Sequence, residues 1–296
     1  MLATLVRDPF HRPGWVYEEK YDGYRILAYK EGRRVRLLSR NDNDRTAAFV
    51  DVARAVQNLP ARTLLLDGEV AAFDRRGVSR FQLLQQGRAP RSYAVFDCLY
   101  KNGKDLRREP LPVRRAALEA VVGARGTVRR ARRMAANGLA AYREAKKRGF
   151  EGIIAKDTAA TYVQGRSNKW LKVKIRQEDE FVIGGYTPPR GAREHFGALL
   201  LGAYDTNGRL QYVGKVGTGF TARTLASLQR MFRPLVRRTP PFENPPRERE
   251  AAYLEPRLVA QIAYEEWTAD RRLRQPAFLG LRDDKRAREV VLPEAT

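Results

Sequence analysis

Short apolar runs separated by polar turns characterise the first two-thirds of the chain. Runs of about five such residues are typical of strands. They cover residues 35–39, 63–67, 93–97 and 152–156. Helices are predicted between them, because Pro112 is placed to open one helix and Asn137 can cap another that stops at Gly149. In this second helix, Leu139, Tyr142 and Ala145 share the predicted apolar face.

Past Lys174 the pattern changes to hairpins. Apolar runs flank Asp205–Gly208, a strong hairpin signal, and Thr221 can cap a helix that runs through Leu225, Leu228 and Met231. A late strand is predicted over residues 258–267. This combination predicts a small β-barrel, of which the nucleic-acid-binding OB-fold is the commonest basic example. The predicted domains are residues 1–176 and 177–296.

Composition and charge indicate a protein that binds a polyanion. The 296-residue chain has 57 Lys+Arg against 34 Asp+Glu, a formal net charge of +23. Nucleic acid is the favoured partner, because neutralising its phosphates releases counterions. No stretch approaches the roughly 18 consecutive apolar residues of a membrane span. The charged first fifteen residues do not read as a signal peptide, so we expect a cytoplasmic, nucleoid-associated protein without a membrane partner.

The segment Glu18–Arg25 is the first that looks unlike a plain scaffold. Lys20 is followed by an aromatic residue, an Asp and a Gly, which suggests an amine held partly buried at the end of a strand. Burial and neighbouring cations lower the pKa of a lysine, and the neutral amine is a nucleophile. A surface hairpin with an ion pair is the alternative for this segment taken alone.

Further charged residues recur at the ends of predicted strands. Asp67 and Glu69 stand at the C-terminal end of a buried strand, and Glu151 opens another. Lys172 and Lys174 alternate with apolar residues, so both project from one face of a strand. Carboxylates suit Mg²⁺, and lysines on one face suit a triphosphate. The alternatives are solvated charges at strand ends and an edge strand guarded by lysines.

Taken in order, these segments resemble the motifs of the covalent nucleotidyltransferase superfamily and, within it, of the ATP-dependent DNA ligases. The matching segments are Lys20–Arg25, Ser39–Asn41, Asp67–Glu69, Val95–Asp97, Glu151–Lys156, Lys169–Lys174 and Pro276–Lys285. Residues 181–187 and 213–220 resemble the ligase module of bacterial end-joining ligase D. The resemblance implies an α+β fold. An ATP-grasp-like nucleotidyltransferase (adenylation) domain of antiparallel sheets and helices would precede a C-terminal OB-fold β-barrel.

The resemblance implies an enzyme that seals 5′-phosphate/3′-hydroxyl nicks or ends in DNA with ATP. Lys20 would carry AMP covalently, and AMP would then pass to the DNA end. Lys172 and Lys174 would hold the α-phosphate and depress the pKa of Lys20 by like-charge repulsion. Glu69 and Glu151 would bind Mg²⁺ or Mn²⁺.

The resemblance also implies further contacts with ATP. Glu18 and Phe96 would contact adenine, and Glu69 would contact the ribose. Arg40 and Arg166 would contact the ribose or phosphates. Arg25 would contact the AMP phosphate or the nick's 5′-phosphate, and Arg282 and Lys285 would contact pyrophosphate. Taken alone, a strand phenylalanine such as Phe96 also fits core packing.

The implied partners are nicked or broken duplex DNA, the bacterial Ku end-binding protein, and polymerase and phosphoesterase modules; we expect a monomer. Arginine pairs offer phosphate contacts, with a solvated face as the alternative. These pairs are Arg107-Arg108, Arg114-Arg115, Arg129-Arg130 and Arg132-Arg133.

Two other functions remain open from the residues. An RNA ligase or a GTP-dependent capping-type nucleotidyltransferase shares the Lys20 motif, and purine choice depends on pocket contacts. A non-catalytic basic nucleic-acid-binding protein would explain the net charge of +23. It would not explain why Lys20, Glu69 and Glu151 stand where the chemistry needs them.

Overall fold

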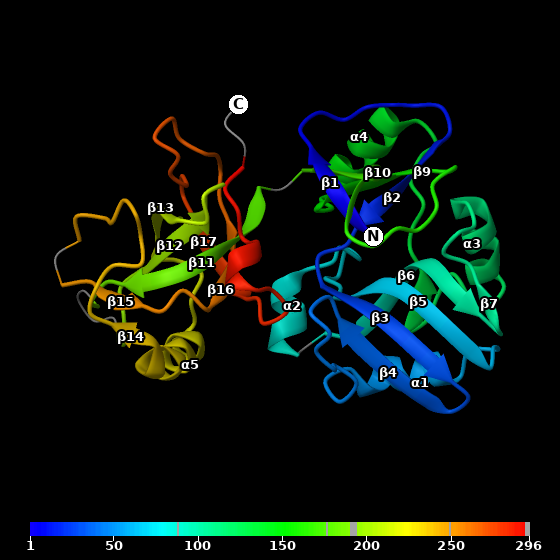
Figure 1. Cartoon of the computed structure of the whole chain (residues 1–296), viewed down its shortest axis with the longest axis horizontal. Helices are drawn as coiled ribbons and strands as arrows, with labels where there is room; N and C mark the ends of the chain where they lie inside the picture. Colours follow the sequence, from blue (N-terminus) through cyan, green and yellow to red (C-terminus); the bar gives the residue numbers. More distant parts are fainter. Residues whose placement is uncertain (88, 176, 190–193, 249, 294–296) are drawn as a thin grey trace. The chain divides into compact units, whose positions relative to one another are not determined.

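Strands dominate both halves of the chain, as the short apolar runs predict. The computed structural model describes all residues except 88, 176, 190–193, 249 and 294–296. The chain divides into two units, Met1–Arg176 and Gln177–Thr296. Each unit is described by itself (Figure 1).

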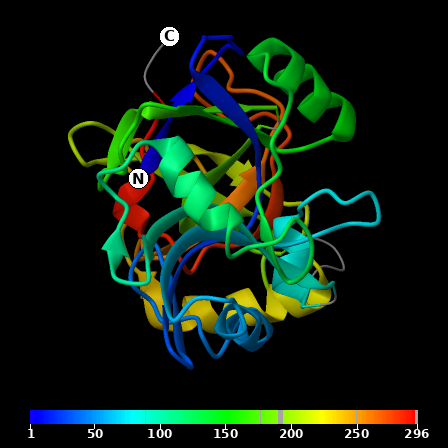
Figure 2. The same cartoon turned by 90° about the vertical axis from the view of Figure 1, so that its right-hand side faces the viewer.

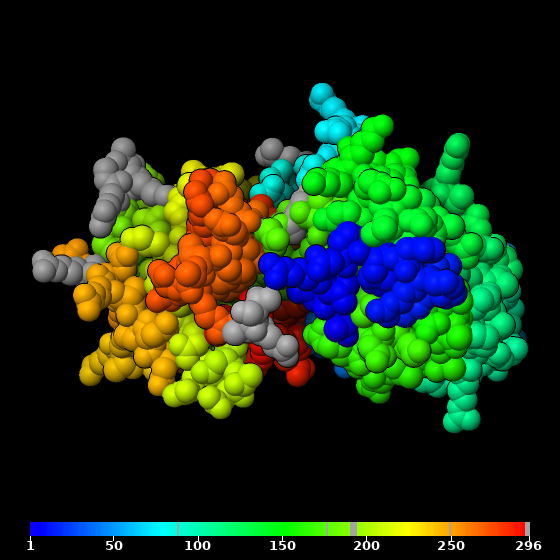
Figure 3. All heavy atoms as spheres, turned by 90° about the horizontal axis from the view of Figure 1, so that it is seen from above, coloured from blue at the N-terminus to red at the C-terminus, as the bar shows by residue number. Residues whose placement is uncertain are grey.

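In the first unit, one sheet is built around β2 and is called the N-terminal sheet. Its strand order is β1-β10-β9-β2, from Leu2–Val6, Arg166–Lys174, Gly152–Asp157 and Trp15–Lys20. β1 and β10 run parallel, whereas β9 is antiparallel to both of its neighbours. The N-terminal segment that contains β1 lies at the surface of this unit (blue in Figure 3).

The second sheet of this unit, called the central sheet, has the order β4-β3-β5-β6-β7, with β8 parallel to β6. Its strands are Arg34–Ser39, Tyr24–Glu31, Thr63–Ala72, Arg91–Lys101, Lys104–Asp105 and Val128–Arg130. The helices of the unit are α1 (Val50–Gln57), α2 (Phe81–Gln86), α3 (Leu111–Glu119) and α4 (Gly138–Arg148). α3 and α4 lie on its outside (Figure 2).

The predicted helix start at Asn137 is confirmed, and so are Tyr142 and Ala145 on the packed face, whereas Leu139 does not lie there. The Asn137 side chain accepts hydrogen bonds from the N–H groups of Leu139 and Ala140, and Gly149 ends the helix with a φ of 72°. The buried residues of α4 are Gly138, Ala141 and Ala145, and Leu139 is 41% exposed. The face is shifted because α4 packs on β2 and β9 through its small residues.

The prediction that the buried strand ends at Asp67 is wrong. β5 continues through Asp67 and Glu69 to Ala72, because Val70 still pairs with Tyr24 of β3 on one side and with Tyr93 of β6 on the other. Both carboxylates therefore lie inside a sheet rather than at its edge.

In the second unit, strands pair in the order β13-β12-β11-β15-β14, with β16 between β11 and β17. The strands are β11 (Glu178–Tyr186), β12 (Leu199–Tyr204), β13 (Leu210–Val216), β14 (Val236–Arg237), β15 (Ala252–Leu254), β16 (Val259–Ala263) and β17 (Ala277–Leu281). The N–H groups of Leu273 and Phe278 bond back to Val213 and Thr218 at 2.9 and 3.0 Å. This returns the chain around β17 to the β13 side, as a barrel requires.

Local signals in this unit are also confirmed. The predicted hairpin joins β12 to β13 through Asp205, whose N–H bonds the Arg209 carbonyl at 2.9 Å. Thr221 caps α5 (Ala222–Phe232). Its buried face ends in Phe232, whereas Met231 is 39% exposed.

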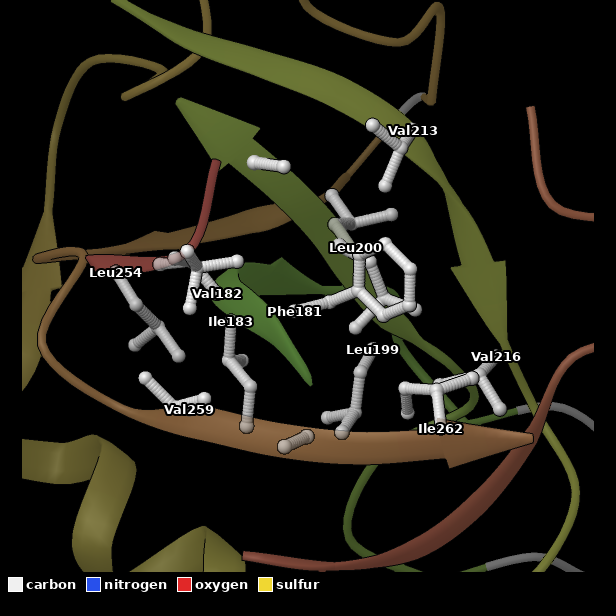
Figure 4. Packing of buried hydrophobic residues seen from close by; sticks show 14 of the residues in the cluster. Phe181, Val182, Ile183, Leu199, Leu200, Val213, Val216, Leu254, Val259 and Ile262 are labelled. Atoms are coloured by element: carbon white, nitrogen blue, oxygen red, sulfur yellow. The ribbon is translucent and has the colours of Figure 1, made fainter. Parts of the chain in front are cut away.

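The core of the second unit is formed by apolar residues from strands that are distant in sequence. Phe181 and Ile183 of β11 pack with Leu200 of β12, Leu254 of β15 and Ile262 of β16 (Figure 4). The short η1 (Arg233–Leu235) and η2 (Ala287–Glu289) complete the unit. No helix within the described part of the chain is long and apolar enough to span a membrane.

The cap of α4 yields a first prediction. Asn137→Ala removes an acceptor that serves two backbone N–H groups, at 3.0 and 3.1 Å. We expect it to lower the free energy of unfolding by about 1 kcal/mol, measured by urea denaturation. Asn137→Asp keeps the acceptor and serves as the control. An equal loss in both variants would contradict the capping role.

Candidate active site

Three adjacent strands of the N-terminal sheet carry the predicted nucleophile and its neighbours on one face. In the register of β2, β9 and β10, Lys20 lies opposite Gly152, and Gly152 lies opposite Lys174. Glu18 and Lys172 occupy a second row two residues away, on either side of β9. Residues opposite each other, or two apart in a strand, point to the same face. The lysines and Glu18 therefore share one face, which we call the charged face.

The opposite face of these strands is apolar and packs against α4. Tyr17, Ile153 and Val173 form a buried cluster there with Ala141 and Ala145 of the helix. The alternation of apolar and charged residues in β10 thus decides which side enters the core. The charged face is left to line the site.

Lys20 ends β2, as the sequence predicts, and its ammonium group forms an ion pair with Glu151. Glu151 directly precedes β9, and its carbonyl accepts a 2.8 Å hydrogen bond from the Ile175 N–H. The next residue must be small, because a Cβ at Gly152 would lie 2.2 Å from the Val173 carbonyl oxygen. The glycine therefore lets β9 and β10 approach each other beside the pair.

The expected depression of the Lys20 pKa is wrong. Burial by itself lowers the pKa of Lys20, but the charge and hydrogen bond of Glu151, with smaller effects of the charges of Asp22 and Glu69, raise it above the ordinary value. The prediction considered only the neighbouring lysines of β10. The ion pair to Glu151, which is distant in sequence, outweighs them and keeps the amine protonated.

Glu18 is buried in the charged face and held by two cations. Its Oε1 pairs with the Arg115 guanidinium of α3, and its Oε2 lies 2.8 Å from Nζ of Lys156. Burial opposes ionisation of Glu18, but Lys156 and Arg115 outweigh it and lower its pKa. Glu18 is therefore an ionised carboxylate, which can only accept hydrogen bonds.

Phe96 lies in a group of aromatic and cationic side chains beside Glu18. Its ring contacts Trp170 edge to face, with centroids 5.8 Å apart. Lys156 Nζ lies 4.6 Å from the Phe96 centroid and 4.1 Å from that of Trp170, and Arg25 Cζ lies 5.4 Å from Phe96. Such cation–π contacts are strong when water is excluded. The ring is half-buried and close to both Glu18 and Arg25.

Arg25 belongs to β3 of the central sheet and pairs with the fully buried Asp67 of β5. Its Nε and Nη2 donate to the two Asp67 oxygens at 3.0 and 2.6 Å, and the Tyr162 hydroxyl donates to Oδ2 at 2.8 Å. Glu69 lies directly opposite Arg25 in the register and is half-buried. Asp67, one of the two carboxylates that were predicted together, is thus occupied by Arg25 and Tyr162.

The other predicted site residues belong to other elements, and each is described by its own surroundings. Arg40 is exposed just after β4, and Arg166 is exposed at the start of β10, where it bonds the Ala3 carbonyl at 3.1 Å. Arg282, in the second unit, is buried and binds both Asp284 oxygens at 2.8 Å. Lys285 lies 3.3 Å from Glu180, also in the second unit.

Two arginines predicted as DNA contacts are internal. Arg114 is fully buried and binds both oxygens of Asp97, at 2.8 and 2.9 Å. Arg115 is the buried partner of Glu18. The phosphate-contact hypothesis is therefore wrong for this pair, because both guanidinium groups are used to neutralise buried carboxylates.

A metal ion could be held by Glu151. Within the residues that the structure describes, Glu151 Oε2 is buried without a hydrogen-bond partner. That same part of the chain contains no group of three or more His, Cys, Asp or Glu side chains placed around a metal ion. This fits Mg²⁺ or Mn²⁺ bound through one or two carboxylates, with water and phosphate as the other ligands.

Sequence reasoning missed several residues of this site. Ile154 is half-buried on the charged face, between Glu18 and Lys172 in the register. The two-residue period of β9 and β10 would have placed it there, together with Lys156 and Trp170. No local pattern pointed to Arg115 or Tyr162, because their partners are far away in sequence. These five residues are Ile154, Lys156, Trp170, Arg115 and Tyr162.

Two family models match most of the chain. The model described as ATP dependent DNA ligase domain matches residues 1–174, and the ATP dependent DNA ligase C terminal region matches residues 192–285.

Several curated proteins are similar over nearly the whole chain. The multifunctional non-homologous end joining protein LigD of Pseudomonas aeruginosa is 40% identical over 302 residues, 98% of this chain and 36% of that protein. Its namesake in Mycobacterium tuberculosis strain H37Rv, a DNA repair protein, is 38% identical over 94% of this chain and 37% of that protein. The DNA ligase of Thermococcus fumicolans is 33% identical over 97% of this chain and 56% of that protein. The chain thus spans little more than a third of the LigD proteins.

Solved structures with the same fold include mycobacterial DNA ligase D complexed with ATP and MES. It is 34% identical, with a TM-score of 0.69, and 98% of each chain is covered. The ligase domain of Mycobacterium tuberculosis LigD is 33% identical, with a TM-score of 0.52 over 99% of this chain and 98% of that one. The α+β fold is the fold of these ligase structures.

The buried carboxylate of Glu19, on the apolar face, yields a pH-dependent prediction. Burial raises the pKa of Glu19 to about 7, although the charge of Arg132, 3.4 Å away, opposes the shift. Between the ordinary glutamate pKa and about pH 7, the folded protein keeps a proton that the unfolded chain has released. Stability therefore falls as pH rises through this window. We expect Glu19→Gln to match the wild type at pH 5 and to exceed it at pH 8 by on the order of 3 kcal/mol.

Urea denaturation at the two pH values tests this expectation. Glu31→Gln, at an exposed position at the end of β3, is the control for loss of a negative charge. Equal destabilisation by Glu19→Gln at both pH values would show that Glu19 is an ionised partner of Arg132.

Proposed function

This chain belongs to the ATP-dependent DNA ligases, and we propose that it joins 5′-phosphate to 3′-hydroxyl ends in nicked or broken duplex DNA during non-homologous end joining. The observation that carries the proposal is the charged face. There Lys20 pairs with Glu151 and shares its side of the sheet with Lys172 and Lys174. Residues 1–176 act as the adenylation domain, and residues 177–296 as the OB-fold domain.

The proposed reaction begins at Lys20. Its neutral amine attacks the α-phosphorus of ATP, a P–N bond forms, and the bond from this phosphorus to the bridging oxygen breaks to release pyrophosphate. A DNA 5′-phosphate oxygen then attacks the adenylate phosphorus, the P–N bond breaks, and Lys20 regains its proton. Finally the 3′-hydroxyl attacks the DNA phosphorus, loses its proton and displaces AMP.

The amine must become neutral before the first step. The ion pair with Glu151 keeps it protonated, whereas burial by itself favours the neutral form. Release of Lys20 from Glu151 therefore activates the nucleophile. Mg²⁺ or Mn²⁺ bound to Glu151, with Glu69 as a second ligand, would compete with Lys20 for the Glu151 carboxylate. The ion would also offset the negative charge of the phosphates.

We assign the remaining roles by position. Lys172 and Lys174 bind the α-phosphate, and Glu18 and Phe96 bind adenine, which is supported by the ionised, buried state of Glu18. Ile154 supplies an apolar surface on the same side. The other contacts with ribose and phosphates are made by Glu69, Arg25, Arg40, Arg166, Arg282 and Lys285.

The wider context is proposed from the relatives. The protein acts as a monomer on DNA in the cytoplasm, at the nucleoid, with the Ku end-binding protein and with polymerase and phosphoesterase modules. The names of the LigD relatives support end joining rather than capping or RNA ligation. The surplus of positive charge, +23, supports binding to duplex DNA.

Intact-protein mass spectrometry tests the nucleophile. After incubation with ATP and Mg²⁺ or Mn²⁺, the wild type should gain the mass of one adenylyl group, and Lys20→Ala should gain none. GTP in place of ATP tests purine choice, and nicked DNA and RNA duplexes test the polynucleotide. A folded wild-type protein that binds DNA but gains no adduct with either metal would contradict the proposal and favour a binding protein.

The charged face yields a further prediction. Lys174→Ala removes an ammonium group in the same cross-strand row as Lys20, on the other side of Gly152. It should slow adenylation of Lys20 at least about tenfold, because charge neutralisation dominates phosphoryl transfer. Lys169→Ala is the matched control. Lys169 belongs to the same strand but is exposed and paired with Asp157 at 2.9 Å. Equal effects of the two substitutions on the adenylation rate would argue against a specific phosphate contact.

A further inference from the structure

Tyr162, between β9 and β10, is joined to the proposed phosphate site through a buried carboxylate. Its hydroxyl donates to Asp67 Oδ2 at 2.8 Å, and the same oxygen accepts from Arg25 Nη2 at 2.6 Å. Asp67 is fully buried, so water does not solvate it. A buried carboxylate that shares its oxygens among good donors has one favoured orientation.

The tyrosine ring is itself held in place. It contacts Trp170 edge to face, with centroids 6.0 Å apart, and Arg114 Cζ lies 5.9 Å from its centroid. Arg114 is anchored in turn by its two bonds to Asp97. The hydroxyl is therefore presented to Asp67 by a rigid group rather than by a mobile surface side chain.

Of the three linked residues Tyr162, Asp67 and Arg25, Arg25 is the one that extends to the proposed site. Its Nε and Nη2 are bonded to Asp67, and Nη2 also donates to the Met1 carbonyl at 2.5 Å, while the side chain remains 22% exposed and its Cζ lies 5.4 Å from the Phe96 centroid. Lys156 Nζ lies over the same Phe96 ring, 4.6 Å from its centroid, and 2.8 Å from Glu18, which is two residues from Lys20 on the charged face. Contacts through Phe96 and Lys156 therefore link Arg25 to the face that carries Lys20.

We propose that Tyr162 is a positioning residue for the joining reaction, because its hydroxyl orients Asp67 and thereby aims Arg25 at the reacting phosphate. This inference rests on the proposed ligase function and on the phosphate role of Arg25. The phosphate is either the α-phosphate of ATP or the phosphate at an adenylated nick. Both present the anionic oxygens that a guanidinium fork binds.

The test compares Tyr162→Phe, which removes only the hydroxyl, with Tyr17→Phe. The Tyr17 hydroxyl also makes a hydrogen bond in the first unit, to the Arg12 N–H at 3.1 Å, but on the apolar face away from the site. Two rates are measured for each protein: adenylation of Lys20 by ATP, and sealing of a nicked duplex that already carries the 5′-adenylate. We expect Tyr162→Phe to slow at least one of them about tenfold, and Tyr17→Phe to change neither.

A double-mutant cycle with Arg25→Ala shows whether the effect acts through Arg25. If it does, Tyr162→Phe should cause no further loss of rate once Arg25 has been replaced. Thermal unfolding of all variants separates this coupling from a general loss of stability. The rate that falls identifies which of the two phosphates Arg25 binds.

Three outcomes would overturn parts of the account, and they are distinguishable. A wild type without a Lys20 adenylate contradicts the ligase function itself. Full activity of Arg25→Ala contradicts the role of Arg25, and the proposal with it. The positioning role alone is contradicted if the wild type is active and Arg25→Ala is impaired, but Tyr162→Phe has no effect in the wild type. It is also contradicted if Tyr162→Phe has an equally large effect in the Arg25→Ala background.

Discussion

The strict two-residue alternation across β2, β9 and β10 is the constraint on which the site depends. Because these strands are in regular register, Tyr17, Ile153 and Val173 enter one core with α4, while Glu18, Lys20, Lys172 and Lys174 gather on the other face; Glu19 is a buried carboxylate on the apolar side. A slip of one residue would put Lys172 and Lys174 into that core. The cost of burying two ammonium groups therefore enforces the same register that aligns Lys20 with its neighbours.

Paired buried charges connect this face to the central sheet. Glu18, Asp67 and Asp97 are all buried, and each is neutralised by arginine or lysine from a distant segment. Such pairs contribute little net stability, but removing one partner is costly, so they specify geometry. Several arginines and lysines therefore neutralise internal carboxylates.

Local signals were reliable where the physics is local. Asn137 and Thr221 cap their helices through their own side chains, and the hairpin at Asp205 closes over a few residues. The predicted face of α4 was less reliable. Leu139 is exposed because the partner surface, and not hydrophobicity alone, selects which side of a helix is buried.

The sequence by itself determined the order of the ligase motifs, the alternation that places Lys172 and Lys174 on one face, and the end of β2 at Lys20. Only the tertiary structure decided that an ion pair with Glu151 keeps Lys20 protonated, that Asp67 is occupied by Arg25 and Tyr162, and that Arg115 is internal. The reason is that periodicity follows from neighbouring residues. The charge state and orientation of a buried group depend instead on partners that folding brings close to it in a low-dielectric interior. How far apart two residues are in sequence does not show how close they are in space.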